Sequence, residues 1–514
     1  MPAGLLRDLE GRIAVTEGTG AIPILAPFTE EAIGSTPQAG RADVAGAVAT
    51  ARRAQPTWAA VPVRERGRIL SRFHDLLLDR AEIAMDVIQL EGGKARVAAF
   101  EEVFDTVATT RYYMNTGPGL LRRRRRSVSF PLVTRTWEYH HPVGVVGSIV
   151  PWNFPFTLAI SDVIPALLAG NSVIIKPDEQ TPYSALYGLS LLEEAGLPEG
   201  VAQVITGDGE LIGPDLIDAV DFIAFTGSTA VGRLVAERAG RRLIGASMEL
   251  GGKNAAIVLA DADLSVTIPG VIRGVFANGG QLCISAERIY VERVIADRFT
   301  AALVEAVREL EMSTDFDYRG LMSSQSSRRH LELVTSHVED AVDAGATLLS
   351  GGKSRPDVGP LFYEPTVLTG VDEGMTLCRT ETFGPVVSIY PVDDVEEALG
   401  LANDSEYGLN FSVWTTSHSR GVDVATRLRA GTVGVNDGYA ATWSSYDAPL
   451  GGMMASGLSR RHAAVGILKF TETQTVSVQR WIPAFAPFMG MSYRKFQGFL
   501  TVMLKILKRL PFYK

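Results

Sequence analysis

The stretch "DFIAFTGSTAVGRLVAERAG", residues 221–240, changes its pattern of apolar residues at its centre. It opens with a short apolar run typical of a buried strand and closes with the spacing typical of a helix. Gly227 and Gly232 allow a tight turn between the two, and Ser228 and Thr229 supply hydroxyl groups there. The stretch therefore predicts a strand, a turn and a helix whose N-terminus attracts phosphate, although the glycines of any such turn look similar.

The same succession of strand and helix recurs on both sides of this stretch. Before it, "VGVVGSIVPWNFP" at 143–155 and "NSVIIKPDEQTP" at 171–182 each suggest a strand followed by the start of a helix. A second series begins after residue 250, where "ERIYV" and "GPVVSIYPV" each precede a helical pattern. This alternation predicts an α/β fold with parallel sheets covered by helices on both faces, and a length of 514 residues predicts more than one domain.

Composition and charge exclude several classes of protein. The chain is 46% hydrophobic and 21% charged, which suits a soluble globular protein, and its net charge of −9 argues against general nucleic-acid binding. Two cysteines form no disulfide framework, and neither a signal peptide nor a membrane-spanning apolar run is evident, so we expect a cytoplasmic protein. The histidines show no metal-ligand spacing, so no metal site is predicted.

Two basic segments depart from this average. Residues 122–126 are five consecutive arginines, which suit a phosphate-binding surface or, more often, a solvated connection. In the tail, residues 482–514, Phe496, Leu500 and Met503 recur at helical spacing among lysines and arginines. Such an amphipathic helix either packs on the protein or a partner subunit, or it makes peripheral contact with an anionic membrane.

Cys283 stands in "NGGQLCISAER", residues 278–288, among glycine, asparagine and glutamine. A structural cysteine usually lies among apolar residues instead. Gly279 and Gly280 let the backbone approach something closely, which favours a thiol presented to a ligand. Cys378 lacks such surroundings, and we expect it to be inert packing.

Two further residues suit catalysis but are ambiguous by themselves. Asn153 stands between Trp152 and Phe154 at a strand end, where an amide either stabilises an oxyanion or simply forms a turn. Glu249 precedes two glycines in "MELGGK", where a carboxylate either acts as a general base or is merely solvated.

These motifs occur together and in a fixed order. With "PWNFP", "KPDEQTP", "FTGSTAVG", "MELGGKN", "GQLC", "ETFGPV" and "SGLSRRHAAVGILKFTE", the chain resembles the aldehyde dehydrogenase superfamily. The resemblance implies a Rossmann-like cofactor domain at 1–123 and 142–250 and an α/β catalytic domain at 251–452. It also implies a β oligomerisation flap at 124–141 and 470–481, and hence a homodimer or homotetramer.

By the same resemblance, Cys283 is the nucleophile, Glu249 the general base and Asn153 the side-chain donor to the oxyanion. The implied reaction is attack of the thiolate on an aldehyde, hydride transfer to NAD or NADP, and hydrolysis of a thioester to the carboxylic acid. The positions that match the lining of the cofactor are Trp152, Lys176, Glu179, Gly227, Ser228, Gly232, Leu250, Glu381 and Phe383.

Glu179 governs the expected choice of cofactor. Its carboxylate suits both hydroxyls of the adenosine ribose of NAD, whereas the 2′-phosphate of NADP meets a like charge there. Lys176 offsets part of this repulsion. We expect NAD to be preferred, although relatives that use NADP often carry a small residue at this point.

The substrate has two candidates. "PLFYEPTVLT" and "LCISAERIYV" are most similar to a succinate-semialdehyde dehydrogenase subgroup, so succinate semialdehyde is the leading expectation. The arginines that hold the substrate carboxylate in that class fall at Ser161 and Ala277 here, which makes an apolar aldehyde the rival. Arg460 and Arg461 are candidates to replace them. The same loop has Ser459 and Ala463 where many members of the superfamily have glycine.

Interpretations from other classes stay open at this point. A cysteine hydrolase normally needs a histidine base, and no histidine lies in the motifs around Cys283, Glu249 and Asn153. A non-enzymatic protein that binds RNA or membranes through its arginines predicts binding without turnover.

Overall fold

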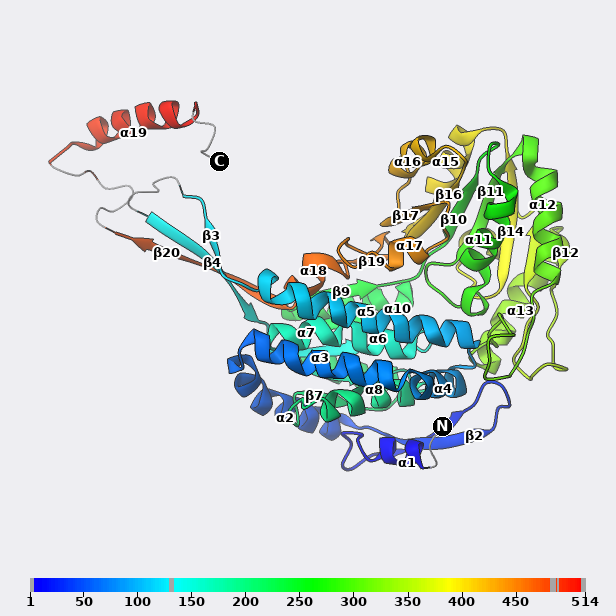
Figure 1. The fold of residues 1–514 in the computed structure, drawn as a ribbon, viewed down its shortest axis with the longest axis horizontal. Coiled ribbons are helices and arrows are strands. Elements are labelled where there is room, and N and C mark those ends of the chain that lie inside the picture. Colours follow the sequence, from blue (N-terminus) through cyan, green and yellow to red (C-terminus); the bar gives the residue numbers. More distant parts are fainter. Residues whose placement is uncertain (1–3, 129–133, 481–486, 488–489, 510–514) are drawn as a thin grey trace.

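The computed structural model describes residues 4–128, 134–480, 487 and 490–509. Figure 1 shows two α/β bodies, one below and one at the upper right, and a thin arm that leaves the lower body at the left. The predicted alternation of strands and helices is confirmed in both bodies.

The lower body is built on a six-stranded sheet with the order β19-β9-β8-β5-β6-β7. Between β5 and β8 the direction in which strands are added reverses. Ligand sites in open α/β sheets lie at such a reversal, beyond the carboxyl ends of the strands, and Asn153 and Ser228 follow β5 and β8 there. The strands are β5 (Val145–Ile149), β6 (Ser172–Lys176), β7 (Ala202–Val204), β8 (Phe222–Thr226) and β9 (Gly245–Glu249), all parallel, with β19 (Gly457–Leu458) antiparallel to β9.

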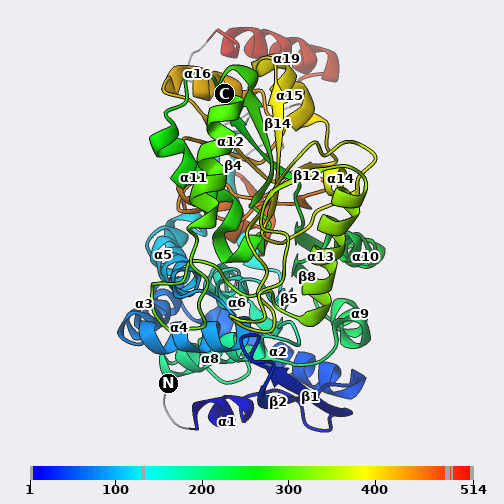
Figure 2. The ribbon, with the colours of Figure 1, turned by 90° about the vertical axis from the view of Figure 1, so that its right-hand side faces the viewer.

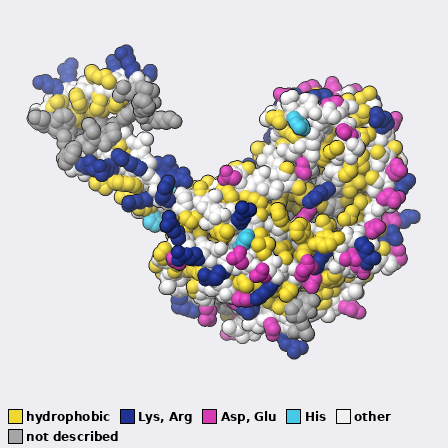
Figure 3. All heavy atoms as spheres, in the orientation of Figure 1, with side chains coloured by type: hydrophobic (Ala, Val, Ile, Leu, Met, Phe, Trp, Pro, Cys, Tyr) yellow, Lys and Arg dark blue, Asp and Glu magenta, His cyan; other side chains and the backbone are white. Residues whose placement is uncertain are grey.

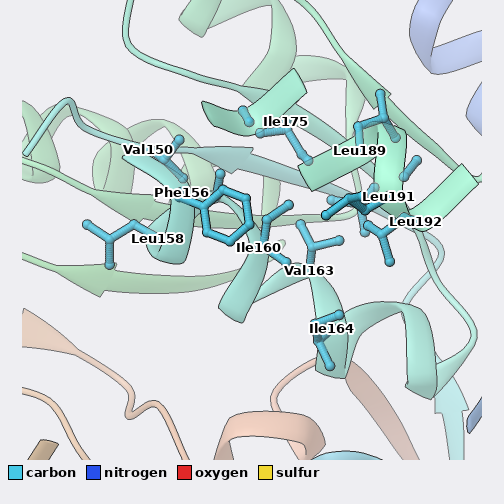
Figure 4. Close-up of a cluster of buried hydrophobic side chains, with 14 of the residues drawn as sticks. Val150, Phe156, Leu158, Ile160, Val163, Ile164, Ile175, Leu189, Leu191 and Leu192 are labelled. Atoms are coloured by element: carbon cyan, nitrogen blue, oxygen red, sulfur yellow. The ribbon is translucent and has the colours of Figure 1, made fainter. Parts of the chain in front are cut away.

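Helices cover both faces of this sheet. In Figure 4, Phe156, Ile160 and Val163 lie beside Ile175 of the sheet and Leu189. These five side chains are at most 1% exposed, so the helix that follows Asn153 is anchored by close packing. One face carries α6 (Pro155–Ser161), α7 (Val163–Ala169), α8 (Pro182–Glu194), α3 (Val63–Asp79), α4 (Ala81–Gly92) and α5 (Arg96–Leu120), and the other carries α2 (Arg41–Ala60), α9 (Gly209–Ala219) and α10 (Thr229–Arg242). At the N-terminal end lie α1 (Leu5–Glu10) and the hairpin of β1 (Gly20–Leu25) and β2 (Ala32–Gln38).

The second body contains a seven-stranded sheet with the order β12-β13-β14-β11-β10-β16-β17, which Figure 2 shows above the first body. All neighbouring pairs are parallel except β12 with β13. The strands are β10 (Asn254–Val258), β11 (Ala286–Glu292), β12 (Thr347–Ser350), β13 (Thr366–Thr369), β14 (Val386–Val392), β16 (Asn410–Trp414) and β17 (Thr432–Val435). Its main helices are α11 (Leu264–Phe276), α12 (Arg293–Arg308), α13 (Arg328–Asp343), α15 (Val395–Asn403) and α16 (His418–Thr426). Shorter elements of the chain are α14 (Thr376–Arg379), α17 (Ala440–Trp443), β15 (Tyr407–Gly408) and β18 (Met453–Met454). The helix α18 (Ala463–Leu468) packs against α5 and α7 of the lower body.

The arm is a three-stranded antiparallel sheet of β3 (Arg124–Arg126), β4 (Thr134–Pro142) and β20 (Thr471–Gln479). Strands from the two parts of the predicted flap, 124–141 and 470–481, therefore pair with each other outside the main sheets. Three of the five consecutive arginines form an edge strand, where Arg126 contacts Glu138 at 2.6 Å, rather than a plain connection.

Beyond the arm, the amphipathic pattern of the tail forms α19 (Tyr493–Leu507). The lysines and arginines along the arm and tail stand out in Figure 3. Parts of the predicted flap and tail, at 129–133, 481–486, 488–489 and 510–514, lie outside the described residues. Within the described ranges, no helix is long and apolar enough to cross a membrane.

Candidate active site

Cys283 lies just after a 3₁₀ turn, Ala277–Gly280, that joins α11 to β11. Asn278, Gly279 and Gly280 have φ angles of 53°, 64° and 73°, so three successive residues are left-handed. A Cβ atom on Gly280 would stand 2.0 Å from the carbonyl oxygen of Gly384. Glycine is required here because another backbone approaches the loop.

Gln281 fixes this loop from inside the protein. Its side chain is 1% exposed, accepts a bond from the Ser326 N–H at 2.9 Å and donates to the carbonyl oxygens of Asn278 and Ser324, each at 2.9 Å. The polar residue beside Cys283 therefore orders the loop that carries the thiol.

The thiol of Cys283 is protonated at neutral pH in this state. Burial raises its pKa to about 12, and the carboxylates of Glu381 and Glu249 raise it further, while Arg461 acts in the opposite direction. Because the thiolate is the nucleophilic form, the site needs a base or an added positive charge before the sulfur can attack.

Asn153 is brought directly to the cysteine loop. Its side chain is buried, and its Nδ2 donates to the carbonyl oxygen of Gln281 at 3.1 Å. An amide nitrogen carries two N–H groups, and this bond uses one of them. The backbone carbonyl oxygen of Asn153 accepts a second hydrogen bond, from Nδ2 of Asn278 at 3.1 Å. The turn after β5 and the loop before β11 are therefore joined.

A buried ion pair that the sequence motifs missed supports Asn153. Lys94 Nζ donates to the Asn153 carbonyl oxygen and to Glu102 Oε1, both at 2.7 Å, and lies 3.4 Å from the centroid of the Phe154 ring. Glu102 in turn accepts the N–H of Phe156 at 2.8 Å, at the start of α6. Burial lowers the pKa of Lys94 and raises that of Glu102. Lys94 ends the segment "EGGK" between α4 and α5, and nothing in that segment points to Asn153.

Glu249 ends β9 and faces the same site. Burial raises the pKa of its carboxyl to about 7, and Arg461 and Lys469 oppose this shift. Its Oε1 is buried without a hydrogen-bond partner among the described residues. A carboxyl group that is half ionised near neutral pH suits general acid–base chemistry.

The turn after β8 forms the helix N-terminus that the sequence predicts. Ser228 Oγ accepts the N–H of Val231 at 3.3 Å and caps α10. A Cβ atom on Gly232 would stand 2.3 Å from Leu250 Cδ2, and one on Gly227 would stand 2.7 Å from the Phe225 ring. A side chain at either glycine would therefore have to displace Leu250 or Phe225.

Lys176 and Glu179 lie together at the end of β6, with Lys176 Nζ 3.4 Å from Glu179 Oε2. Lys176 is buried and beside Gly209 at the start of α9, whereas the Glu179 side chain is 42% exposed and open to a ligand. Burial, with the charge of Glu179 added, raises the pKa of the neighbouring Asp178 to about 6.

The other residues predicted to line the cofactor meet between the two bodies. Glu381 Oε1 accepts the Gly252 N–H at 2.7 Å, and burial raises the pKa of this carboxyl to about 8. The Trp152 ring stands 5.5 Å from the Phe383 ring, and Glu287 holds the Phe383 N–H at 2.9 Å. Glu287 also pairs with buried Lys253.

A cavity of about 370 Å³ opens beside the cysteine loop. One wall is a face of α5 with the spacing i, i+3, i+4, i+7, a helical stripe that sequence analysis did not assign to a site. The lining residues include Val97, Phe100, Glu101 and Phe104 of α5, Leu282 and Ile284 on either side of Cys283, and Phe154, Arg273, Tyr439 and Trp443.

The arginines considered as receptors for a substrate carboxylate, Arg460 and Arg461, already have partners within the protein. Ser161 Oγ donates to Asp105 at 3.1 Å, and Arg461 Nε lies 3.5 Å from Asp162. Arg460 Nη1 donates to the carbonyl oxygens of Gly452 and Ser459, both at 2.7 Å.

The two residues that stand at customary glycines are both left-handed. Ser459 has a φ of 75° and Ala463 a φ of 48°. Both residues therefore have the positive φ that glycine adopts easily, although residues with a side chain prefer a negative φ.

Comparisons with known proteins place this site in a family. The sequence profile of the aldehyde dehydrogenase family matches residues 14–476. A protein of Mycolicibacterium smegmatis named as a putative NADP(+) succinate-semialdehyde dehydrogenase is 50% identical over 489 residues, which are 95% of this chain and 94% of that protein. The 4,4′-diapolycopene aldehyde oxidase of Methylomonas sp. is 36% identical over 493 residues, 93% of this chain and 90% of that protein.

A solved structure agrees with these relatives. The crystal structure of an NAD-dependent aldehyde dehydrogenase from Sinorhizobium meliloti matches with a TM-score of 0.88 at 34% identity, over 93% of this chain and 95% of that chain. The match of sequence and fold over both bodies excludes the interpretations as a cysteine hydrolase and as a non-enzymatic binding protein. The chain belongs to the aldehyde dehydrogenase family and oxidises an aldehyde with NAD or NADP.

Proposed function

We propose that Cys283, Asn153 and Glu249 carry the reaction. The Cys283 sulfur adds to the aldehyde carbon, its proton passes to Glu249, and the resulting oxyanion is held by Asn153 Nδ2 and the Cys283 backbone N–H. When bound, the nicotinamide cofactor supplies the hydride acceptor that turns this adduct into a thioester. Glu249 then releases the thiol proton to solvent, so that its carboxylate is free again. It takes a proton from water, which attacks the thioester, and passes that proton to the departing sulfur, so that the carboxylic acid and the thiol are released.

The cofactor is proposed to lie across the carboxyl end of the first sheet. Lys176 and Glu179 would hold the adenosine ribose, Ser228 at the N-terminus of α10 the pyrophosphate, and Glu381 the nicotinamide ribose. The fit rests on the exposed Glu179 carboxylate and on the capped, phosphate-attracting helix N-terminus. Gly227, Gly232 and Leu250 would shape the pyrophosphate turn, and Trp152 and Phe383 would line the nicotinamide end.

We expect NAD to be preferred over NADP by at least about tenfold in kcat/KM, roughly 1.4 kcal/mol. The reason is the Glu179 carboxylate, which would repel a 2′-phosphate even with Lys176 at 3.4 Å. The name of the Mycolicibacterium relative favours NADP instead. Steady-state kinetics with both cofactors decide the matter, and Glu179→Ser should raise NADP use more than it lowers NAD use.

The proposed substrate is an aldehyde on an apolar chain. The observation that carries this proposal is the cavity beside Cys283, whose wall includes Phe100, Phe104, Phe154 and Trp443. Aromatic walls bind a hydrocarbon chain by removing its surface from water. The relative from Methylomonas, named for a diapolycopene aldehyde, supports the same class.

Succinate semialdehyde is the second candidate, because it is the substrate in the name of the relative that is 50% identical. The two candidates are separated by kcat/KM for hexanal, benzaldehyde and succinate semialdehyde, followed as reduced cofactor. A higher kcat/KM for hexanal supports the apolar class. A preference for succinate semialdehyde would replace it with the second candidate.

The arm and tail are proposed as contact surfaces. Edge strands β3 and β20 suit pairing with another subunit in a homodimer or homotetramer. The basic helix α19 suits either a partner subunit or peripheral contact with an anionic membrane surface. Deleting residues 491–514 separates these two: loss of subunit association supports the first, and loss of binding to phosphatidylserine vesicles with an unchanged oligomer supports the second.

A further inference from the structure

Among the described residues that line the apolar cavity beside Cys283, Glu101 of α5 and Arg273 of α11 form an ion pair. Arg273 Nη2 donates to Glu101 Oε1 at 2.7 Å. Tyr439 Oη donates to the same carboxylate, at 2.9 Å to Oε2 and 3.1 Å to Oε1. Both oxygens of Glu101 are therefore bound, and the guanidinium has an acceptor from the protein itself.

This arrangement bears on which aldehydes can enter. An arginine in a substrate cavity is the usual receptor for a substrate carboxylate, because its N–H groups form a planar fork. Here Glu101 already accepts a hydrogen bond from one N–H group of the Arg273 guanidinium. Its negative charge also repels a second carboxylate. Glu101 is also held in place, since Tyr439 is buried and donates to it. An incoming carboxylate must compete with the Glu101 carboxylate, which is already ordered and loses no further conformational entropy when it binds Arg273.

We propose that Glu101 is a specificity-determining residue that keeps Arg273 from binding a substrate carboxylate and so favours uncharged aldehydes. This inference rests on the proposed function, in which the substrate chain occupies this cavity. It assigns the discrimination to one carboxylate, whereas the proposal of an apolar substrate rests on the aromatic wall. The Arg273 side chain is 55% exposed, so solvent screens the interaction and a moderate effect is expected.

The test compares succinate semialdehyde with its methyl ester, methyl 4-oxobutanoate, which has the same chain without the charge. Glu101→Gln keeps the size of the side chain and an acceptor for Tyr439 but removes the charge. We expect the ratio of kcat/KM for succinate semialdehyde to that for the ester to rise about tenfold. The KM of this variant for succinate semialdehyde should also increase with salt, because the new contact is between exposed charges.

The matched control is the double variant Glu101→Gln/Arg273→Gln, in which the ratio should return to the wild-type value. An unchanged ratio in Glu101→Gln, or a rise that persists in the double variant, would overturn the assignment. A fall of the ratio by tenfold in Arg273→Gln alone would also overturn it, since Arg273 would then already bind the substrate carboxylate. The proposed function fails separately, if the wild-type enzyme prefers succinate semialdehyde to hexanal.

Discussion

The proposed reaction centre and the wall of the proposed substrate cavity are built in different ways. At the centre, Asn153 is 5% exposed, and Lys94 and Glu102 beneath it are 1% and 0% exposed. In the wall, Phe100 and Phe104 are 45% and 51% exposed, and Arg273 meets its partner Glu101 in contact with solvent. The side chains of the centre are fixed by buried hydrogen bonds. The side chains of the wall are partly exposed and can be substituted with less effect on the fold.

This difference explains why the sequence motifs indicate the type of reaction but not the preferred aldehyde. Replacing a residue of the centre leaves a buried charge or donor unpaired, which is costly, and these buried contacts are the same whichever aldehyde is bound. A wall residue faces a cavity and can be exchanged at small cost in folding. Changes at the centre should therefore lower activity toward all aldehydes alike, and changes in the wall should alter the ratio between aldehydes.

The largest effect is expected from Cys283→Ser. Loss of the sulfur nucleophile should lower kcat at least about 10,000-fold for every aldehyde tested. Binding of NAD, measured by fluorescence titration, should change by no more than a few-fold and serves as the control for folding. Activity near the wild-type value would assign the nucleophile to another residue.

Removal of the oxyanion donor comes next. Asn153→Ala should lower kcat by about 100- to 1,000-fold, because a donor aimed at the developing charge is lost. The loss should be equal for hexanal and succinate semialdehyde, measured side by side. A loss below tenfold, or one confined to a single substrate, would reduce Asn153 to a structural turn.

A smaller effect is expected from the residues beneath Asn153. Lys94→Met combined with Glu102→Gln removes both charges of the buried pair and avoids leaving one unpaired. The Asn153 carbonyl then loses its Lys94 contact, and kcat should fall by about 10- to 100-fold for all aldehydes through misplacement of the amide. Circular dichroism checks the fold of the variant. A folded variant with wild-type kcat would show that this pair does not position the centre.

The smallest expected effect is the pH dependence of thioester hydrolysis. Burial raises the pKa of Glu249 to about 7, and only the carboxylate accepts the proton of water. The hydrolysis rate should therefore fall about tenfold as the pH decreases from 8 to 6, with the same midpoint for each aldehyde. Steady-state rates after a burst of reduced cofactor measure it. In Glu249→Gln the slow phase should be nearly arrested at every pH, and a pH profile that survives this substitution would point to another base.

Local sequence patterns were sufficient for much of the fold and of the centre. Residues 221–240 predicted a strand, a turn and a helix, and the structure has β8, the Ser228 cap and α10 in that order. Such patterns act over a few residues, because periodicity and turn chemistry are local. The polar neighbours of Cys283, which are adjacent in the chain, predicted a thiol presented to a ligand, while its role as the nucleophile was implied by the family resemblance and stays a prediction.

The long-range contacts were not available from the sequence. Lys94 and Asn153 are 59 residues apart, Glu101 and Arg273 are 172 apart, and Glu101 and Tyr439 are 338 apart. Gly279 and Gly280 were predicted to let the backbone approach something closely, but the sequence did not show that the neighbour of Gly280 is the backbone of Gly384.

The sequence by itself thus determined the alternation of strands and helices, the family and the type of reaction. The alternation follows from residue spacing within short segments, whereas the family and the type of reaction rested on the resemblance of the ordered motifs to the aldehyde dehydrogenase superfamily. Only the tertiary structure decided what supports Asn153, what neutralises Arg273 and what lines the cavity. Those properties arise where α4, α5, α11 and the residues around Tyr439 meet, and packing between distant segments is set by the whole fold.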